Sequence, residues 1–308
     1  MAIAVDWGGV TGTANVSFST GNATITSGAN PWLSTDVGKT IWVNAAGPGG
    51  AVLKTYIAVF NNAGSVDMAT TASYTSSDNA WWFVGQYELN NPITSLTWKH
   101  VCSGANRYLV VPVWTNDATF PDGCTYNGAA MTMLDSYRSN DKGAQLWGLA
   151  APALGTYDVV LTYSGSAIAY AGTSVSYTGV HQSVSVGTPA HAYMSGTTIS
   201  VNVTSAVGEL VVDCLATSYK AYTITATGTG QVIQGELYAQ TGNLSGNNGK
   251  LDTSSTTGAA TTTVSYTSSG TNYGNITAIP LKPAGVGTDY CLRPINLIRQ
   301  SVSRSALA

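Results

Sequence analysis

Few residues in this chain belong to the types that carry out chemistry. Its 308 residues include three histidines, and its three glutamates stand far from one another and outside any motif that places a second acid nearby. Hydrolysis needs a nucleophile activated by a base, or two carboxylates on either side of the substrate. The chain has no Gly-x-Ser-x-Gly turn, and we interpret His181 and Glu209 as structural residues. We therefore expect no catalytic residues, no cofactor and no enzymatic activity.

The aspartates of the middle of the chain are the remaining candidates for metal binding. Four of them flank the stretch from Thr125 to Leu134, namely Asp117, Asp122, Asp135 and Asp141. They lack the tight spacing of a calcium-binding loop, and Asp122-Gly123 is an ordinary turn pair. We expect no metal site, and a calcium site assembled from several loops stays open as the alternative.

The tryptophans are the last group that could bind a ligand. An exposed aromatic face can stack on a sugar ring, so we regard Trp81, Trp82 and Trp114 as a candidate surface for a glycan or a partner protein. In a strand, successive side chains point to opposite faces, so one of Trp81 and Trp82 can be core while the other meets a neighbouring domain or partner. Packing in the core or between domains is the alternative for each of them.

Four cysteines, Cys102, Cys124, Cys214 and Cys291, are widely separated and form no Cys-x-x-Cys pair. We expect free, buried thiols. A disulfide, for example between Cys102 and Cys214, is the alternative.

The composition points to strands and turns and away from charged partners. Only 9% of the residues are charged, where about 25% is usual, while 44% are hydrophobic and 34 are glycine. The net charge of −3 shows no basic footprint for nucleic acid or anionic lipid, so we exclude both as partners. The chain begins without a basic segment followed by an apolar one, and it has no long apolar run. We expect a soluble protein made in a cytoplasm.

Short apolar runs separated by turn residues recur along the chain. Between Arg107 and Gly179 the runs RYLVVPVW, TYNGAAMTML, AQLWGLAA and TYDVVLTYSG are closed by Gly, Pro, Asn or Asp. This pattern predicts consecutive antiparallel strands in a sandwich or barrel. We expect an all-β protein with a small β-domain over residues 1–90, a larger jelly-roll-like antiparallel sandwich over 95–284, and an extension over 285–308. A joint is expected from Glu88 to Thr94, and a polar surface loop from Thr241 to Ala260.

Two stretches carry motifs that can be compared with known protein domains. The first carries Asp36-Val37-Gly38-Lys39-Thr40-Ile41 and Gly47-Pro48-Gly49-Gly50. It resembles a small β-domain of phage tail-fibre and tailspike proteins. The acidic segment that opens a β-helix in many such proteins is absent, so a depolymerising β-helix is not implied.

The motifs of the second stretch are Asn106-Arg107-Tyr108-Leu109-Val110-Val111, Leu146-Trp147-Gly148-Leu149, Tyr177-Thr178-Gly179-Val180-His181-Gln182 and Ile279-Pro280-Leu281-Lys282-Pro283. This stretch resembles a sandwich domain of phage structural and bacterial surface proteins. Neither resemblance brings a catalytic set with it.

The resemblances imply a non-enzymatic virion protein on the exterior of a phage particle, as a fibre, tail-attached or head-decoration component in several copies. Its expected partners are other virion proteins and further copies of itself. A receptor or carbohydrate-binding module for host glycans is the alternative, and a polysaccharide depolymerase is a more remote one. The extension could form an amphipathic helix from Pro294, and its candidate anchor residues are Arg293, Ile295, Leu297, Ile298 and Arg299.

Overall fold

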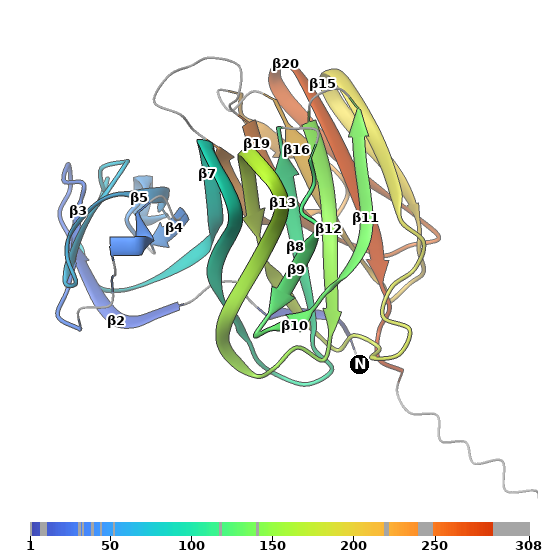
Figure 1. The fold of residues 1–308 in the computed structure, drawn as a ribbon, viewed down its shortest axis with the longest axis horizontal. Coiled ribbons are helices and arrows are strands. Elements are labelled where there is room, and N and C mark those ends of the chain that lie inside the picture. Colours follow the sequence, from blue (N-terminus) through green and yellow to red (C-terminus); the bar gives the residue numbers. More distant parts are fainter. Residues whose placement is uncertain are drawn as a thin grey trace, which may run out of the picture.

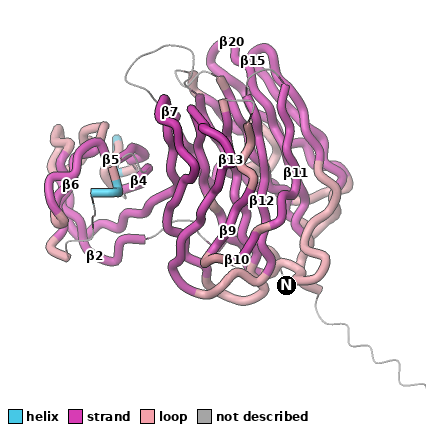
Figure 2. The backbone as a smooth tube through the Cα atoms, viewed as in Figure 1, coloured by secondary structure: helices cyan, strands magenta, loops and turns pink. Residues whose placement is uncertain are grey.

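The computed structural model confirms that the protein is all-β and antiparallel, with a β-sandwich as its larger part (Figures 1 and 2). It describes residues 2–6, 11–29, 32, 34–37, 40–43, 45–51, 53–116, 119–139, 142–218, 222–239 and 249–285. The jelly-roll connectivity stays a prediction. None of the helices in these ranges has the length and apolar character needed to cross a membrane.

The small domain is a closed barrel. Its strands are β2 (Thr11–Phe18), β3 (Thr24–Ser27), β4 (Thr40–Val43), β5 (Leu53–Asn62), β6 (Ser65–Met68) and the start of β7 (Ser76–Cys102). Pairing runs β7–β2–β3–β6–β5–β4 and returns from β4 to β7, so the ring has no free edge. Two short 3-10 turns, Ser34–Asp36 and Pro48–Gly50, connect strands. Buried residues such as Trp32, Ile41 and Ile57 fill the barrel.

The barrel and the sandwich share strand β7. Its first part pairs with β2 and β4, and from Gly85 onward it pairs with β13 (Gly155–Thr173). The segment from Glu88 to Thr94, where we expected a joint, therefore lies inside one continuous strand. The structure also differs from the expected 1–90 division at the N-terminus, since β1 (Ala4–Asp6) pairs with β14 (Val175–Thr178) of the sandwich.

The sandwich consists of two facing layers. The first contains β8 (Tyr108–Thr115), β9 (Gly123–Tyr126), β10 (Ala129–Ala130), β11 (Thr132–Ser139), β12 (Lys142–Ala150), β13 and β14. The second contains β15 (Ala190–Thr204), β16 (Leu210–Thr217), β17 (Ile224–Ala226), β18 (Val232–Ala239), β19 (Gly249–Thr257) and β20 (Thr261–Leu281).

Turn chemistry explains one of the tightest connections. Asn127-Gly128 joins β9 to β10 as a two-residue hairpin loop, with Ala129 paired to Tyr126. The φ angles of Asn127 and Gly128 are 50° and 75°. A type I′ turn requires positive φ at both positions and matches the twist of the strands, which is why Asn-Gly is favoured there.

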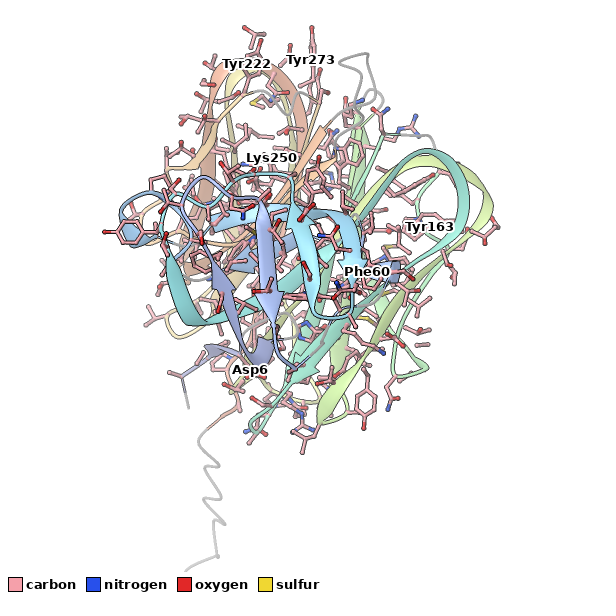
Figure 3. The ribbon with its side chains drawn as sticks, turned by 90° about the vertical axis from the view of Figure 1, so that its left-hand side faces the viewer. Asp6, Phe60, Tyr163, Tyr222, Lys250 and Tyr273 are labelled. Carbon is pink, nitrogen blue, oxygen red and sulfur yellow. The ribbon has the colours of Figure 1, made fainter. Side chains whose placement is uncertain are left out.

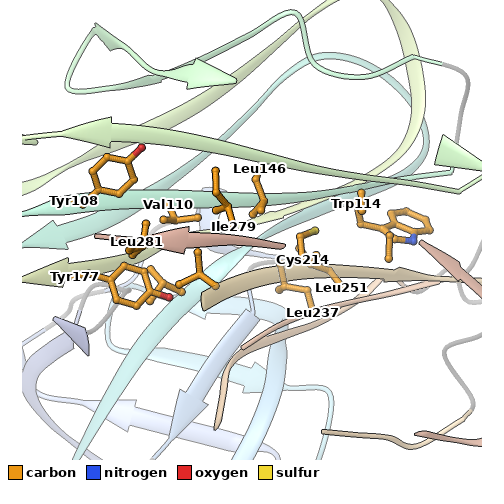
Figure 4. Close-up of a cluster of buried hydrophobic side chains, with 14 of the residues drawn as sticks. Tyr108, Val110, Trp114, Leu146, Tyr177, Cys214, Leu237, Leu251, Ile279 and Leu281 are labelled. Carbon is orange, nitrogen blue, oxygen red and sulfur yellow. The ribbon is translucent and has the colours of Figure 1, made fainter. Parts of the chain in front are cut away.

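Each layer has a core of its own, and a third core lies between them. The shared core, shown in Figure 4, contains Val110 and Trp114 of β8, Cys214 of β16 and Ile279 of β20. The opposite face of β8 packs into the core of the first layer, around Trp98. The opposite face of β16 packs into the core of the second layer, around Tyr266. Residues that alternate along one strand therefore belong to two different cores.

The polar stretch expected to be a surface loop forms a buried strand where it is described. Residues 249–257 are β19, and all of them except Thr257 are buried. β19 lies between β16 and β18, so its backbone is paired on both sides. Backbone pairing and the side-chain hydrogen bonds of Thr253 and Ser254 to Asp213 help to offset the poor apolar content of the sequence, because a buried polar group is tolerated when it is hydrogen-bonded.

Three of the four cysteines confirm the prediction of free, buried thiols, and Cys291 lies outside the described residues. Cys102, Cys124 and Cys214 are buried and unpaired by disulfides, and Cys102 and Cys214 belong to different cores. Burial raises the pKa of the Cys102 thiol to about 11 and raises those of Cys124 and Cys214 further.

We expect these three thiols to be unreactive in the folded protein, because the thiolate is the attacking form. In a Cys291→Ser variant, a thiol reagent at about pH 8 should label none of them quickly, and all three after denaturation. Rapid labelling of any of the three under native conditions would contradict the packing described here.

Candidate functional site

Of the three tryptophans predicted to form a surface site, only Trp114 has a side chain that the structure describes. Trp114 is fully buried in the shared core, and its indole Nε1 donates a hydrogen bond to the Thr217 carbonyl at 2.9 Å. It is therefore a core residue, which corrects its place in the candidate surface. The backbone of Trp81 and Trp82 lies in β7, opposite Val43 and Trp42 of β4. Their side chains, and the anchor residues after Gly285, lie outside the described residues.

The three histidines occupy different environments. The Nδ1 of His181 accepts the backbone N–H groups of Ser183 and Val184, at 3.1 and 3.0 Å, so this ring has the structural role that we predicted. Nδ1 of His191 lies 3.4 Å from a carboxylate oxygen of Asp135, and its ring stacks on Tyr137 at 4.1 Å. This contact joins the two layers of the sandwich.

His100 and Ser174 form the one described pair that has the appearance of a nucleophile and its base. His100 Nδ1 lies 2.8 Å from Ser174 Oγ, which also accepts a hydrogen bond from Trp98 Nε1 at 2.8 Å. His100 is fully buried and Ser174 is 1% exposed. Burial lowers the pKa of the imidazole to about 3. Because no substrate can reach this pair, we assign it to packing.

The acids that we considered on loops are engaged in structural bonds where they are described. Glu209 accepts the backbone N–H of Ala206 at 3.0 Å, as expected for a turn charge. Asp122 accepts the N–H of Ser164, and Asp135 accepts the hydroxyl of Thr277. Asp117 and Asp141 lie outside the described residues. Within those residues, no three His, Cys, Asp or Glu side chains are grouped so that they could hold a metal ion.

A row of charged residues, most of them buried, crosses the second layer and reaches the barrel, and sequence reasoning missed it. This charge row consists of Asp213 on β16, Lys250 and Asp252 on β19, Glu236 on β18, and Lys54 on β5 of the barrel. Lys250 Nζ lies 2.7 Å from an Asp252 carboxylate oxygen and 3.3 Å from a Glu236 one. Lys250 and Asp252 are 1% and 0% exposed. Figure 3 labels Lys250.

The charge row continues into the barrel. The other carboxylate oxygen of Glu236 lies 3.1 Å from Lys54 Nζ, and this ammonium also lies over the ring of Trp42, 4.7 Å from its centroid. Glu236 is thus held between a buried lysine and a partly exposed one. The arrangement fastens the barrel to the second layer, in addition to the strand β7 that it shares with the first.

Burial and charge act in opposite directions on these acids. Burial raises the pKa of Asp213 to about 7, although its carboxylate accepts hydrogen bonds from Ser254 Oγ and from Tyr266 OH. Burial also raises the pKa of Asp252, and Lys250 only partly offsets this. For Glu236, the charges of Lys250 and Lys54 outweigh the effect of burial, so its pKa is held below the usual value.

The pKa of Asp213 gives a pH dependence with a definite sign. A carboxyl whose folded pKa is raised from 3.8 to about 7 stabilises the fold fully below pH 3.8 and loses this contribution as the pH rises through 7. The amide that replaces the carboxyl in an Asp213→Asn variant stays neutral and can still accept from Tyr266. We expect the free energy of unfolding of the variant to exceed that of the parent by an amount that grows with pH. The difference should rise from about 1 to about 4 kcal/mol between about pH 5 and pH 8, since one pKa unit corresponds to about 1.4 kcal/mol.

The measurement is the free energy of unfolding of both proteins along the same pH series. His100 titrates in the opposite sense, because its lowered pKa weakens the fold as the pH falls, and taking the difference between the two proteins removes its contribution. A difference that does not change with pH would contradict the assignment of a raised pKa to Asp213.

The barrel carries a hollow on its surface, between β2 and β3. Its volume is about 410 Å³, and its lining is rich in hydroxyl groups, with Ser17, Phe18, Ser19, Asn22, Thr24, Thr26 and Thr75. Phe18 is only 4% exposed, so it lies at the floor and offers no open aromatic face. Hydroxyl and amide groups of this kind can exchange hydrogen bonds with the hydroxyls of a sugar. Thr75 is far in sequence from the other lining residues, so no local pattern predicts this hollow. Its one sequence signal is the abundance of Ser, Thr and Asn.

Comparisons with protein families, with curated proteins and with solved structures each found no match.

Proposed function

We propose that this chain is a non-enzymatic structural protein of a bacteriophage particle, exposed on the exterior and present in several copies. The motifs around Asp36 and Arg107 suggest the class of protein. The observation that carries the proposal is the double connection between barrel and sandwich, through the continuous strand β7 and through the contact of Lys54 with Glu236. Such a connection makes a stiff two-part body, which suits a component that must project from a particle without bending.

The C-terminal extension would attach this body to its neighbours. The last described residues lie beside the turn after β14, where the Ala284 N–H donates to the Gly179 carbonyl at 2.7 Å. Deleting residues 286–308 should leave the thermal unfolding of the protein unchanged and should abolish its incorporation into particles. Deleting only residues 305–308 serves as the control, because it keeps Arg293, Ile295, Leu297, Ile298 and Arg299. Normal incorporation of the longer deletion would contradict the role of the extension as an anchor.

A carbohydrate-binding role is the second candidate, and the hydroxyl-lined hollow between β2 and β3 of the barrel favours it. The full-length protein on an array of bacterial polysaccharides should then bind a host glycan, and Asn22→Ala should abolish binding. Asn61→Ala is the matched control, because Asn61 donates to Asp67 at 2.9 Å and does not line the hollow. Absence of binding to every polysaccharide would leave the structural role alone.

The depolymerase alternative requires two carboxylates lining a cleft. The acids that cluster in the described residues, Asp213, Asp252 and Glu236, belong to the charge row, and the first two are 0% exposed. They give this alternative no support.

A further inference from the structure

The two layers of the sandwich repeat one strand pattern. In each, a long first strand pairs with a long last strand, the second strand pairs with both the last and the fifth, a short third strand pairs with the start of the last, and the fourth pairs with the fifth. We call residues 85–178 the N-terminal unit and residues 190–281 the C-terminal unit. The strands of the N-terminal unit are, in order, β7, β8, β9, β11, β12, and β13 together with β14. The corresponding strands of the C-terminal unit are, in the same order, β15, β16, β17, β18, β19 and β20.

The match extends to lengths and register. β8 and β16 each have 8 residues, β11 and β18 each have 8, and β12 and β19 each have 9. β14 continues the register in which β13 pairs with β8, so the two together correspond to the single strand β20. Apart from the two-residue strand β10, which has no counterpart in the C-terminal unit, the units therefore agree strand by strand as well as in their order of pairing.

The units also share an irregularity. The pairing of β11 with β12 shifts register between Met133 and Asp135, the second and fourth residues of β11. The pairing of β18 with β19 shifts register between Ile233 and Gly235, which are again the second and fourth residues of their strand. A bulge is a defined feature that related proteins keep in place. Its recurrence at one position is what we expect of two copies of one domain, and not of a chance likeness between two sheets.

Both units bury the corresponding face against each other. Val110 and Trp114 of β8 lie in the shared core, as do Val212 and Ala216 at the corresponding positions of β16. Contacts between the units recur in mirrored form, since β11 packs on β20 and β18 packs on β13. The pairing of the units is therefore close to two-fold symmetric, as in a dimer of identical domains.

Hydrogen bonds across the shared face add specificity. Asn275 of β20 is fully buried; its Oδ1 accepts the Ser139 N–H at 3.0 Å and its Nδ2 donates to the Lys142 carbonyl at 2.7 Å. At the same end of this face, where Asn275 pairs with Ala216, Trp114 Nε1 donates to the Thr217 carbonyl. A buried face with its polar groups paired is a recognition surface, because a wrong partner would leave these groups unpaired.

One difference between the units has a structural reason. In the C-terminal unit, the segment before β15 runs along the end of β20, with Val186 bridged to Leu281. In the N-terminal unit, the corresponding part of β7 pairs with β2 and β4 of the barrel, and β1 takes its place beside β14. Asp6 of β1 fixes this strand by accepting the backbone N–H of Ser103 at 2.7 Å. The barrel is thus joined to a domain whose pattern is otherwise kept.

We infer that the sandwich consists of two copies of one domain, and that the shared face is a pairing surface whose partner is a second copy of that domain. Within one chain the two units satisfy each other. The pairing does not depend on the peptide connection between them, so units from different chains of this protein can pair in the same way. This inference concerns the fold's own interaction surface and does not rest on the proposed function.

The experiment cuts the connection in the full-length protein. A specific protease site is inserted between Ser183 and Val184, which are both exposed, and the folded protein is cleaved and then diluted. We expect the two fragments to co-elute with the mass of the intact chain and to separate only in denaturant. The uncleaved insertion variant controls for folding. Fragments that separate on dilution under native conditions would overturn the inference.

Two further arms test the surface and its partner. In the cleaved protein, Trp114→Ala should weaken association of the fragments at least about tenfold, whereas Val264→Ala, in the separate core of the C-terminal unit, should not. Unfolding and refolding a mixture of tagged and untagged cleaved proteins should give complexes with fragments from different molecules. Refolded tagged fragments that never carry an untagged partner would contradict recognition of a second copy.

Discussion

Replacing Trp114 by alanine should lower the free energy of unfolding by about 3–5 kcal/mol, the usual cost of removing a buried aromatic side chain. Trp114 is fully buried in the shared core and loses its hydrogen bond to Thr217 in the variant. Its ring also lies against Gly249, where a Cβ atom would collide with the ring carbon Cζ2. The neighbouring strand is thus shaped to this side chain, and the cavity left behind cannot close easily.

Thermal unfolding followed by circular dichroism measures this effect, and the melting temperature should fall by roughly 6–20 °C. Trp114→Phe is the matched control, because it keeps most of the ring and removes the hydrogen bond, and its loss should be smaller. An unchanged melting temperature for Trp114→Ala would mean that the residue does not lie in the core.

Replacing Lys250 by methionine should cost about 3–5 kcal/mol above about pH 8, because Asp252, whose pKa burial raises to about 7, is then ionised in the parent protein and loses its cation in the variant. Asp252 is 0% exposed and lies 2.7 Å from Lys250 Nζ, and Glu236 loses one of its two lysines. The loss should shrink as the pH falls, since protonation of Asp252 removes the uncompensated charge.

Two variants separate this effect from a general loss of packing. Lys54→Met removes the partly exposed lysine of the same row and should cost about 1 kcal/mol or less. The double variant Lys250→Met/Asp252→Leu removes both buried charges and should recover most of the stability. Equal losses for Lys250→Met and Lys54→Met in denaturant unfolding would contradict the buried position of Lys250.

Sequence patterns predicted the class of the fold better than its connections. Alternating apolar runs and turn pairs such as Asn127-Gly128 depend on neighbouring residues only, so the all-β sandwich could be predicted. The closure of the barrel depends on pairing of β4 with β7, and the placement of β1 beside β14 joins strands far apart in the chain. Local periodicity carries no information on such pairings, and this is why the pattern groups residues 1–90 into one block.

The sites illustrate the same limit. A tryptophan in an apolar strand can lie on either face, so Trp114 is a candidate for stacking until the position of the second layer decides which face is buried. The charge row was hidden for the opposite reason. The sequence of β19 resembles a polar loop, since Lys250 and Asp252 suggest exposure until their pairing with each other and with Glu236 on β18 is known. The repeat was hidden because corresponding positions of the two units are buried alike but carry different residues. Val111 of β8, for example, corresponds to Asp213 of β16.

Labelling of intact particles tests the proposed function most directly. An antibody raised against the purified full-length protein, applied to purified phage particles and viewed by electron microscopy, should mark several sites on the particle exterior. The particle that lacks residues 286–308 of this protein should carry none of the label. Particles that contain no copy of the protein, by labelling and by mass spectrometry of their components, would contradict the proposal of a structural role on the virion.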